Sequence, residues 1–332
     1  MYQNSAAIIR HDLNAFVEEA AKSDDHLFGN KLLPTYSTNA RAGIYPRIDI
    51  DSGELLKKDS TLRAPTGTYN ETTRKFKTAN YECLDRGLEE RIDDVLVKDY
   101  DRFFDVEVLT SKLIMRTLKI DYEKRVFDIC QNTSNNATTI SAKQNIYGSA
   151  ADWGDEAEIS NWDFAKVLMD AIKAMTKRGE TPNTLVLSST QWNYIRRLGK
   201  LNTFLYGNLG GGVGYKLINN TDIGKAFGIQ NVYIAHSYYD TSGRMSGTAS
   251  LAALWDKQYG WLGNVQGGEI SGGGFGRTFV WSKDGGLFNT ETYRSEPRRG
   301  DMVRVRHHTD ELVVNKNAGV LIDFAGSASW TD

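Results

Sequence analysis

Residues 161–200 read NWDFAKVLMDAIKAMTKRGETPNTLVLSSTQWNYIRRLGK and predict a helix, a short buried strand and a second helix. Apolar residues at three- and four-residue steps indicate the first helix: Phe164, Val167, Leu168, Ala171, Ile172 and Met175. Gly179 and Pro182 are typical of the end of a helix. The apolar run at 185–187 then predicts the strand, and the hydroxyl groups of Ser189 and Thr190 are typical of the next helix start.

The longest helical pattern covers residues 86–131, where apolar residues from Leu88 onward recur at steps of three, four and five. The expected core face of this helix comprises Phe103, Leu109, Leu113, Leu118 and Val126. Most of the charged residues on its other face, a set that includes Glu123, are expected to be solvated and to form ion pairs. A shorter pattern predicts an amphipathic helix at 5–22, with these apolar residues on one face: Ile8, Ile9, Leu13, Phe16, Val17 and Ala20.

Residues 44–80 are unusually polar. Strand-like patterns flank the segment, at 44–50 and again at 74–81, but the middle is nearly free of apolar residues. So little hydrophobic content cannot fold alone, and we therefore expect a long hairpin that lies on a neighbouring subunit. The alternative is a flexible surface loop. The residues expected to make the contact between subunits are Asp51, Gly53, Leu55, Lys57, Lys58 and Tyr69.

The rest of the chain mixes linkers with strands. Residues 133–160 are rich in Ser, Thr, Asn and Gly and predict a linker between domains. Buried strands are predicted at 230–236 and 249–255, further strands at 278–281, 288–294, 302–307 and 311–315, and a final apolar strand at 318–324. Helices with strands around them, followed by a run of strands, indicate the α+β class.

Composition excludes several classes of protein. The net charge of −2 over 332 residues does not favour a polyelectrolyte partner for nucleic acid. The two cysteines, Cys83 and Cys130, are expected to be buried thiols, and no close pair is available for zinc. No apolar run approaches the roughly 18 residues of a membrane span, and no signal peptide is evident, so we expect an intracellular, soluble protein without membrane contact. The 16 Tyr and 7 Trp indicate contacts between proteins, because these side chains combine an apolar ring with a group that forms hydrogen bonds.

Motifs for catalysis are weak. The glycine-rich run 210–216 ends in Gly-Tyr-Lys and is followed by Leu217, so it lacks the Gly-Lys-Ser/Thr of a phosphate-binding loop. His307 and His308 are adjacent in a predicted strand, so their side chains point to opposite faces and cannot share one metal unaided. We therefore expect no enzyme, no cofactor and no metal. A carbohydrate-active enzyme or lectin is the alternative from another class.

Five arginines form the densest basic group: Arg294, Arg298, Arg299, Arg304 and Arg306. Acidic residues are interleaved with them, so ion pairs or solvated charges are the favoured interpretation. A phosphate-facing patch is the alternative.

The order of these segments resembles the HK97-type major capsid proteins of tailed bacteriophages over most of the chain. Residues 99–132 resemble the spine helix of that family, and Leu118-Lys119-Ile120-Asp121-Tyr122-Glu123 resembles the recurring end of that helix. Residues Ala253 to Trp261 resemble the outgoing strand and turn of the family's axial domain. The resemblance divides the chain into an N-terminal arm (1–43), an extended hairpin loop (44–80), a peripheral domain with the spine helix (81–150), an axial domain (151–285), peripheral return strands (286–326) and a C-terminal tail (327–332).

This resemblance implies a shell subunit that assembles as pentamers and hexamers into an icosahedral head enclosing double-stranded DNA. Its implied partners are itself, a portal, scaffolding or cement proteins, and DNA by weak non-specific contact; its implied location is the virion, and the host cytoplasm during assembly. An encapsulin-type compartment is the alternative with the same fold. The loop near the capsomer axis would comprise Gly207, Gly210, Gly211, Gly212 and Gly214, and crosslinks as in some members would join Lys57 or Lys58 to Asn315 or Asn317.

Overall fold

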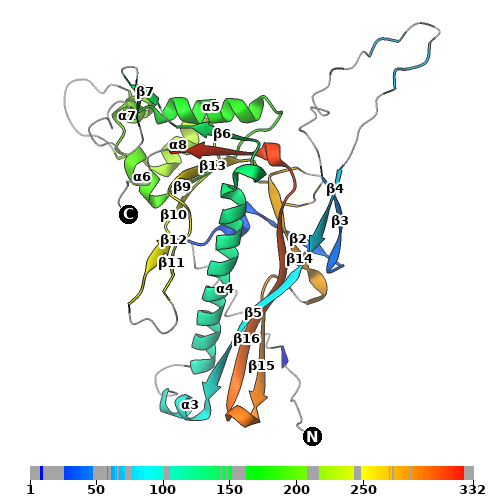
Figure 1. Cartoon of the computed structure of the whole chain (residues 1–332), viewed down its shortest axis with the longest axis vertical. Helices are drawn as coiled ribbons and strands as arrows, with labels where there is room; N and C mark the ends of the chain where they lie inside the picture. The colour runs from blue at the N-terminus through cyan, green and yellow to red at the C-terminus, as the bar shows by residue number, and fades with distance from the viewer. Residues whose placement is uncertain are drawn as a thin grey trace. The chain divides into compact units, whose positions relative to one another are not determined.

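The chain folds into two compact units, drawn in Figure 1. The computed structural model describes residues 8–9, 26–47, 58, 61–63, 65, 67–71, 77–100, 105–142, 144–146, 149–151, 162–207, 217–242, 248–268, 270, 273–284 and 286–324. Unit 1 comprises residues 1–43, 80–127 and 277–312, and unit 2 comprises residues 44–79, 128–276 and 313–332. Both mix helices with strands, so the predicted α+β class is confirmed.

Unit 1 is built on a six-stranded sheet with the order β1-β15-β16-β14-β2, and β5 pairs with β16 beside this path. Its strands are β1 (Ile8–Ile9), β2 (Thr35–Thr38), β5 (Leu84–Asp93), β14 (Gly276–Trp281), β15 (Asn289–Ser295) and β16 (Gly300–Val313). The ladder between β5 and β16 is antiparallel and runs from the pair Asp93–Gly300 to the pair Leu84–Thr309.

The long helix α4 (Val106–Gln131) packs on this sheet, and Figure 1 shows it running alongside β5 and β16. Its contribution to the core is Ile114, Met115 and Leu118, which meet Ile92, Val303 and Val305 of the strands. Two short helices complete the unit, α2 (Gly29–Leu32) and α3 (Asp94–Tyr100).

Two parts of unit 1 differ from the sequence prediction. Residues 84–93 form a strand although a helix was expected from Leu88. The four-residue step between Leu88 and Ile92 fits one face of a helix and also one face of a strand. The segment forms a strand because its backbone pairs with β16. Ile8 and Ile9 likewise form a strand, paired with Thr292 and Glu291 of β15, where a helix over 5–22 was expected. The other residues of that expected helix lie outside the described residues.

Unit 2 contains a five-stranded sheet with the order β10-β9-β13-β17-β6. Its strands are β6 (Thr138–Ser141), β9 (Thr184–Ser188), β10 (Asn231–Ala235), β13 (Tyr259–Gly263) and β17 (Gly319–Asp323), and its helices are α5 (Phe164–Thr176), α6 (Ser189–Ile195), α7 (Gly199–Tyr206) and α8 (Asn220–Phe227). Figure 1 shows α5 lying along β6 and β17, with which it makes contacts. The helix, strand and helix predicted for 161–200 are confirmed as α5, β9 and α6.

Local chemistry explains this part of unit 2. The Asp163 carboxylate accepts a hydrogen bond from the Lys166 N–H and caps α5. Ser188 and Gln191 form a reciprocal capping box that starts α6 directly after β9. The apolar face of α5 enters a core that includes Leu168, Leu185 and Phe324.

The boundaries of the units differ from the expected domains. Residues 313–324 were expected among the peripheral return strands, but β17 lies between β13 and β6 in the sheet of unit 2. Residues 133–160 were expected to be a linker, yet β6 within them is an edge strand of the same sheet. Residues 277–285, expected in the axial domain, belong to unit 1. Each difference arises because strand pairing joins segments that are distant in sequence.

Three small two-stranded sheets complete the described structure. They are formed by β3 (Ala42–Arg47) with β4 (Lys77–Glu82), β7 (Gln144–Ile146) with β8 (Ser149–Ala151), and β11 (Tyr238–Asp240) with β12 (Leu251–Ala253). Among the described residues, no helix is both long and apolar enough to cross a membrane.

Candidate assembly surfaces

The predicted hairpin has a structural base in the paired strands β3 and β4. Between them, Lys58 is exposed, and the side chains of Leu62 and Tyr69 are 86% and 74% exposed. The Arg63 guanidinium lies 4.8 Å from the centre of the Tyr69 ring. Four contact residues lie outside the described residues: Asp51, Gly53, Leu55 and Lys57. Leu62 was missed by the sequence reasoning, which treated this stretch as almost wholly polar.

The two asparagines predicted for crosslinking are buried. Asn315 donates a hydrogen bond from Nδ2 to Glu180 Oε1 at 2.7 Å, and its Oδ1 accepts one from the Asn317 N–H at 3.0 Å. Glu180 also accepts a hydrogen bond from Asn264. Both amides bond within their own chain and hold the turn before β17 in place. The expected crosslink to Lys57 or Lys58 stays a prediction.

The glycine loop begins at the end of α7. Gly207 caps that helix with φ of 73°, in the left-handed region that favours glycine, and its N–H donates to the Thr203 carbonyl. The remaining residues assigned to the loop, Gly210, Gly211, Gly212 and Gly214, lie outside the described residues.

The predicted core face of the long helix divides into two groups. Leu118 and Val126 are buried, but Leu109 and Leu113 are 42% and 54% exposed, so their assignment to the core is wrong. The five-residue step from Leu113 to Leu118 is the physical reason, because at about 100° per residue it crosses the helix. Phe103 lies outside the described residues.

An unexpected site anchors the N-terminal arm on α4. The Glu123 carboxylate, only 2% exposed, accepts hydrogen bonds from the Phe28 N–H at 2.7 Å and the Gly29 N–H at 2.6 Å. The ring of Phe28 packs against that of Phe127, with centroids 5.3 Å apart. A Cβ atom on residue 29 would lie 2.5 Å from Glu123 Oε2, so the close approach requires glycine. The prediction of a solvated Glu123 was therefore wrong, and no local sequence signal marked its burial.

Burial raises the pKa of Glu123 to about 7, against the opposing effect of the Phe28 and Gly29 N–H groups. An unfolded chain ionises this carboxyl near its ordinary pKa, so the contribution of Glu123 to stability is full below about pH 4.5 and is lost as the pH rises to about 7. Replacing Glu123 by Gln removes this dependence. We expect the stability advantage of the wild type over Glu123→Gln to shrink by roughly 1–3 kcal/mol between about pH 5 and about pH 8.

Urea unfolding at the two pH values measures this difference. Comparing variants is necessary because His307, whose pKa burial lowers to about 3, contributes in the opposite direction as acid is added. Glu90→Gln, at an exposed position of β5, is the matched control and should leave the difference between the two pH values unchanged. An advantage of the wild type that stays constant or grows with pH would contradict the assignment.

Three of the five arginines of the basic group form ion pairs. Arg294 binds Asp94 at 2.6 Å, and Arg304 and Arg306 bind Glu89 and Glu291. These pairs support the favoured interpretation of this group over a phosphate-facing patch.

The adjacent histidines His307 and His308 have different surroundings. His307 is fully buried and stacks on Phe288, whereas His308 lies against Trp281 and 3.7 Å from Asp85. Within the described ranges, no group of three or more His, Cys, Asp or Glu side chains is arranged to hold a metal ion.

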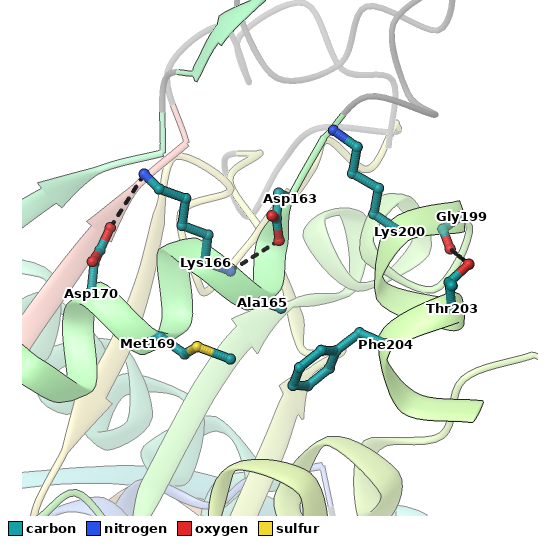
Figure 2. Close-up of a pocket in the computed structure, with 9 residues that line it drawn as sticks. All are labelled: Asp163, Ala165, Lys166, Met169, Asp170, Gly199, Lys200, Thr203 and Phe204. Carbon is teal, nitrogen blue, oxygen red and sulfur yellow. Dashed lines mark hydrogen bonds and ion pairs between the residues drawn. The ribbon is translucent and has the colours of Figure 1, made fainter. Parts of the chain in front are cut away.

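An open depression of about 700 Å³ lies between α5 and α7 (Figure 2). Met169 and Phe204 supply its apolar surface, and both are about half exposed. Lys166 and Asp170 form an ion pair of 3.6 Å on its rim, and Lys200 lies opposite them (Figure 2).

Comparison of the sequence with protein-family models and with curated proteins finds no match. Solved structures are similar in fold. A phage-related protein from Bordetella bronchiseptica RB50 is 16% identical, with a TM-score of 0.69 over 97% of this chain and 99% of that chain. The mature capsid of bacteriophage PhiM1 is 10% identical, with a TM-score of 0.57 over 89% of this chain and 86% of that chain. A virus-like particle from Pyrococcus furiosus is 10% identical, with a TM-score of 0.54 over 94% of this chain and 98% of that chain.

These structures match nearly the whole of the chain rather than one of its units. The arm, the paired strands β3 and β4, the long helix α4 and the five-stranded sheet of unit 2 follow one another in the order that the sequence predicted. The chain therefore has the HK97-like capsid fold.

Proposed function

We propose that the chain is the major capsid protein of a tailed bacteriophage, a structural subunit that assembles as pentamers and hexamers into an icosahedral head around double-stranded DNA. The observation that carries this proposal is the likeness to the PhiM1 mature capsid over 89% of the chain. Exposed Leu62 and Tyr69 between β3 and β4 support it, because a neighbouring subunit that lay on this segment would bury their apolar surface.

In this proposal unit 1 is the peripheral domain, with α4 as its spine, and unit 2 is the axial domain. The segment between β3 and β4 is the extended hairpin, which lies on a neighbouring subunit. The partners are other copies of the chain, a portal, and scaffolding or cement proteins. Contact with DNA is weak and non-specific, in keeping with the net charge of −2 and the paired arginines. The location is the virion, and the host cytoplasm during assembly.

Electron microscopy of the purified full-length chain tests this function. Closed shells, or rings of five and six subunits, are the expected result. A monodisperse small species at concentrations where shell proteins assemble would contradict it.

An encapsulin-type compartment is the second candidate, favoured by the likeness to the virus-like particle from Pyrococcus furiosus. The two candidates differ in content. Particles isolated from the native source would hold double-stranded DNA in a phage head and protein cargo in a compartment, so nuclease-resistant DNA separates them.

A carbohydrate-binding protein would need aromatic rings that are open to a sugar. Three of the tryptophans that favoured this alternative, Trp162, Trp255 and Trp261, are buried to 1% exposure or less. They support the cores of the fold and offer no ring face to a ligand, so we do not propose this function.

The glycine loop that follows Gly207 is proposed to lie near the capsomer axis and to bind no nucleotide. Lys216 lacks the hydroxyl neighbour of a phosphate-binding loop. Titration with ATP, followed by tryptophan emission, is therefore expected to show no saturable change up to about 1 mM. The control is Lys200→Ala, at an exposed lysine of α7. Saturable micromolar binding that Lys216→Ala abolishes and the control retains would contradict the proposal.

A further inference from the structure

A second depression, of about 440 Å³, lies in unit 2 beside the C-terminal half of α5. We call it the α5–β6 depression, because Ile140 of β6 lines it together with residues at and just after the end of α5. The described residues from the side of α5 are Asp170, Lys173, Ala174, Lys177 and Arg178. Positions 170, 173 and 177 follow at steps of three and four, so they share one face of the helix.

The positive charges of the α5–β6 depression are not neutralised by the residues that the structure describes. Asp170, the one acidic residue of the described lining, forms an ion pair of 3.6 Å with Lys166 (Figure 2). Lys173 and Lys177 are exposed, and neither forms an ion pair with a described residue. The three paired arginines of unit 1 differ from them, since each binds a carboxylate of its own chain.

Arg178 also lines the depression, and its guanidinium has hydrogen-bonding capacity to spare. Its Nη2 donates a hydrogen bond to the Ala137 carbonyl at 3.3 Å, which ties the side chain to the residue before β6. Its Nη1 is buried and has no acceptor among the described residues. A guanidinium carries five N–H donors, and a buried donor without an acceptor costs free energy. An anion with several oxygen atoms would supply the acceptors that this side chain lacks.

The chemistry of the lining favours a phosphate backbone over a protein partner. Protein contacts are anchored by large apolar or aromatic side chains, whereas the apolar members here are Ala174 and the partly buried Ile140. Lys173 and Lys177 are about 6 Å apart along the helix axis. Each strand of DNA carries one charge for about every 3.4 Å of its axis, so the two lysines can neutralise neighbouring phosphates.

We propose that the α5–β6 depression binds the phosphate backbone of double-stranded DNA through Lys173, Lys177 and Arg178. Contacts with phosphates alone carry no base information, so binding is independent of the DNA sequence and weakens with salt. Three cations make few such contacts, in keeping with the net charge of −2. The site rests on the proposed capsid function for its ligand, and it places the contact with DNA on unit 2.

Binding of a fluorescently labelled duplex of about 30 base pairs to unassembled full-length subunits tests the site. Fluorescence anisotropy measures the affinity at salt concentrations from about 50 to about 200 mM. The double variant Lys173→Gln/Lys177→Gln should bind about tenfold more weakly than the wild type at the lowest salt. It should also reduce the slope of log affinity against log salt by about 2, because each lost phosphate contact removes about 0.9.

The matched control is Lys112→Gln/Arg116→Gln, which removes two charges with the same four-residue spacing from exposed positions of α4. Neither of these residues forms an ion pair with a described residue. The affinity of the control should stay within about twofold of the wild type, with the same salt slope. Equal weakening by the two double variants would overturn the proposal, because overall charge would then explain the binding. Wild-type subunits that do not bind the duplex would overturn it as well.

Acetylation of lysines, followed by mass spectrometry, locates the contact on the wild-type chain without any substitution. With saturating duplex, Lys173 and Lys177 should react at least about threefold more slowly than without it, and Lys112 should react equally in both cases. Protection of other lysines that leaves Lys173 and Lys177 fully reactive would overturn the proposal.

Electron microscopy of the wild type and of Lys173→Gln/Lys177→Gln separates the DNA site from the capsid function. Binding that depends on the two lysines, without shells from the wild type, would contradict only the capsid function. Shells from the wild type, without such binding, would contradict only the DNA site. Shells lost in the variant while its DNA binding is unchanged would overturn the site and identify the α5–β6 depression as a contact between copies.

Discussion

Deletion of residues 53–72 is expected to leave a folded subunit that no longer forms shells. The strands at the base, β3 and β4, lie outside the deletion, and the residues that remain between them suffice for a turn. The removed segment has little apolar content to contribute to a core, so the midpoint of thermal unfolding should move by only a few degrees, roughly 4 °C or less. Assembly should fall below detection, because the contact with the neighbouring subunit is gone.

Sedimentation and electron microscopy measure the assembly, and circular dichroism measures the fold. Deletion of residues 243–247, another polar stretch between paired strands (β11 and β12), is the control and should leave both unchanged. Normal shells from the 53–72 deletion would refute the contact role. An unfolded subunit would show instead that the segment supports the core of its own chain.

Signals that act over a few residues, such as apolar spacing and helix caps, predicted the helix, strand and helix of residues 161–200 correctly. The helix, strand and helix over 161–200 were predicted because the apolar period, Pro182 and the hydroxyl cap all act within a few residues of the element they define. The observed cap is Ser188, one residue before the expected Ser189, and it forms the capping box with Gln191. Agreement between periodicity and capping made this stretch the strongest guide to the fold.

Spacing alone misled the prediction elsewhere in the chain. A four-residue step fits a helix and a strand equally, so Leu88 and Ile92 could not reveal that β16 pairs with them. A five-residue step in a helix crosses to the opposite face, so Leu109 and Leu113 were grouped with Leu118 in error.

Partners distant in sequence account for the remaining differences. The place of β17 between β13 and β6 depends on hydrogen bonds to segments that are about 60 and 180 residues away along the chain. Glu123 was assigned to a solvated face because nothing near it in sequence shows that Phe28 and Gly29 lie on it. Buried polar groups of this kind are fixed by tertiary structure, which a local pattern does not contain.

Leu118→Ala should reduce the free energy of unfolding by roughly 2–5 kcal/mol. The Leu118 side chain is 3% exposed and lies between α4 and the strands that carry Val303 and Val305. Truncation removes buried methyl groups and leaves a cavity, which a ladder of paired strands on one side and a long helix on the other cannot readily close. Urea unfolding of the unassembled subunit measures the loss.

Leu113→Ala is the matched variant, because it removes the same atoms from the same helix at a position that is 54% exposed. Its expected cost is no more than roughly 1 kcal/mol, because half of the side chain gains nothing from burial. Equal costs for the two variants would mean that α4 is rotated about its axis relative to the sheet. A loss below about 0.5 kcal/mol for Leu118→Ala would mean that α4 does not pack on the sheet through this face at all.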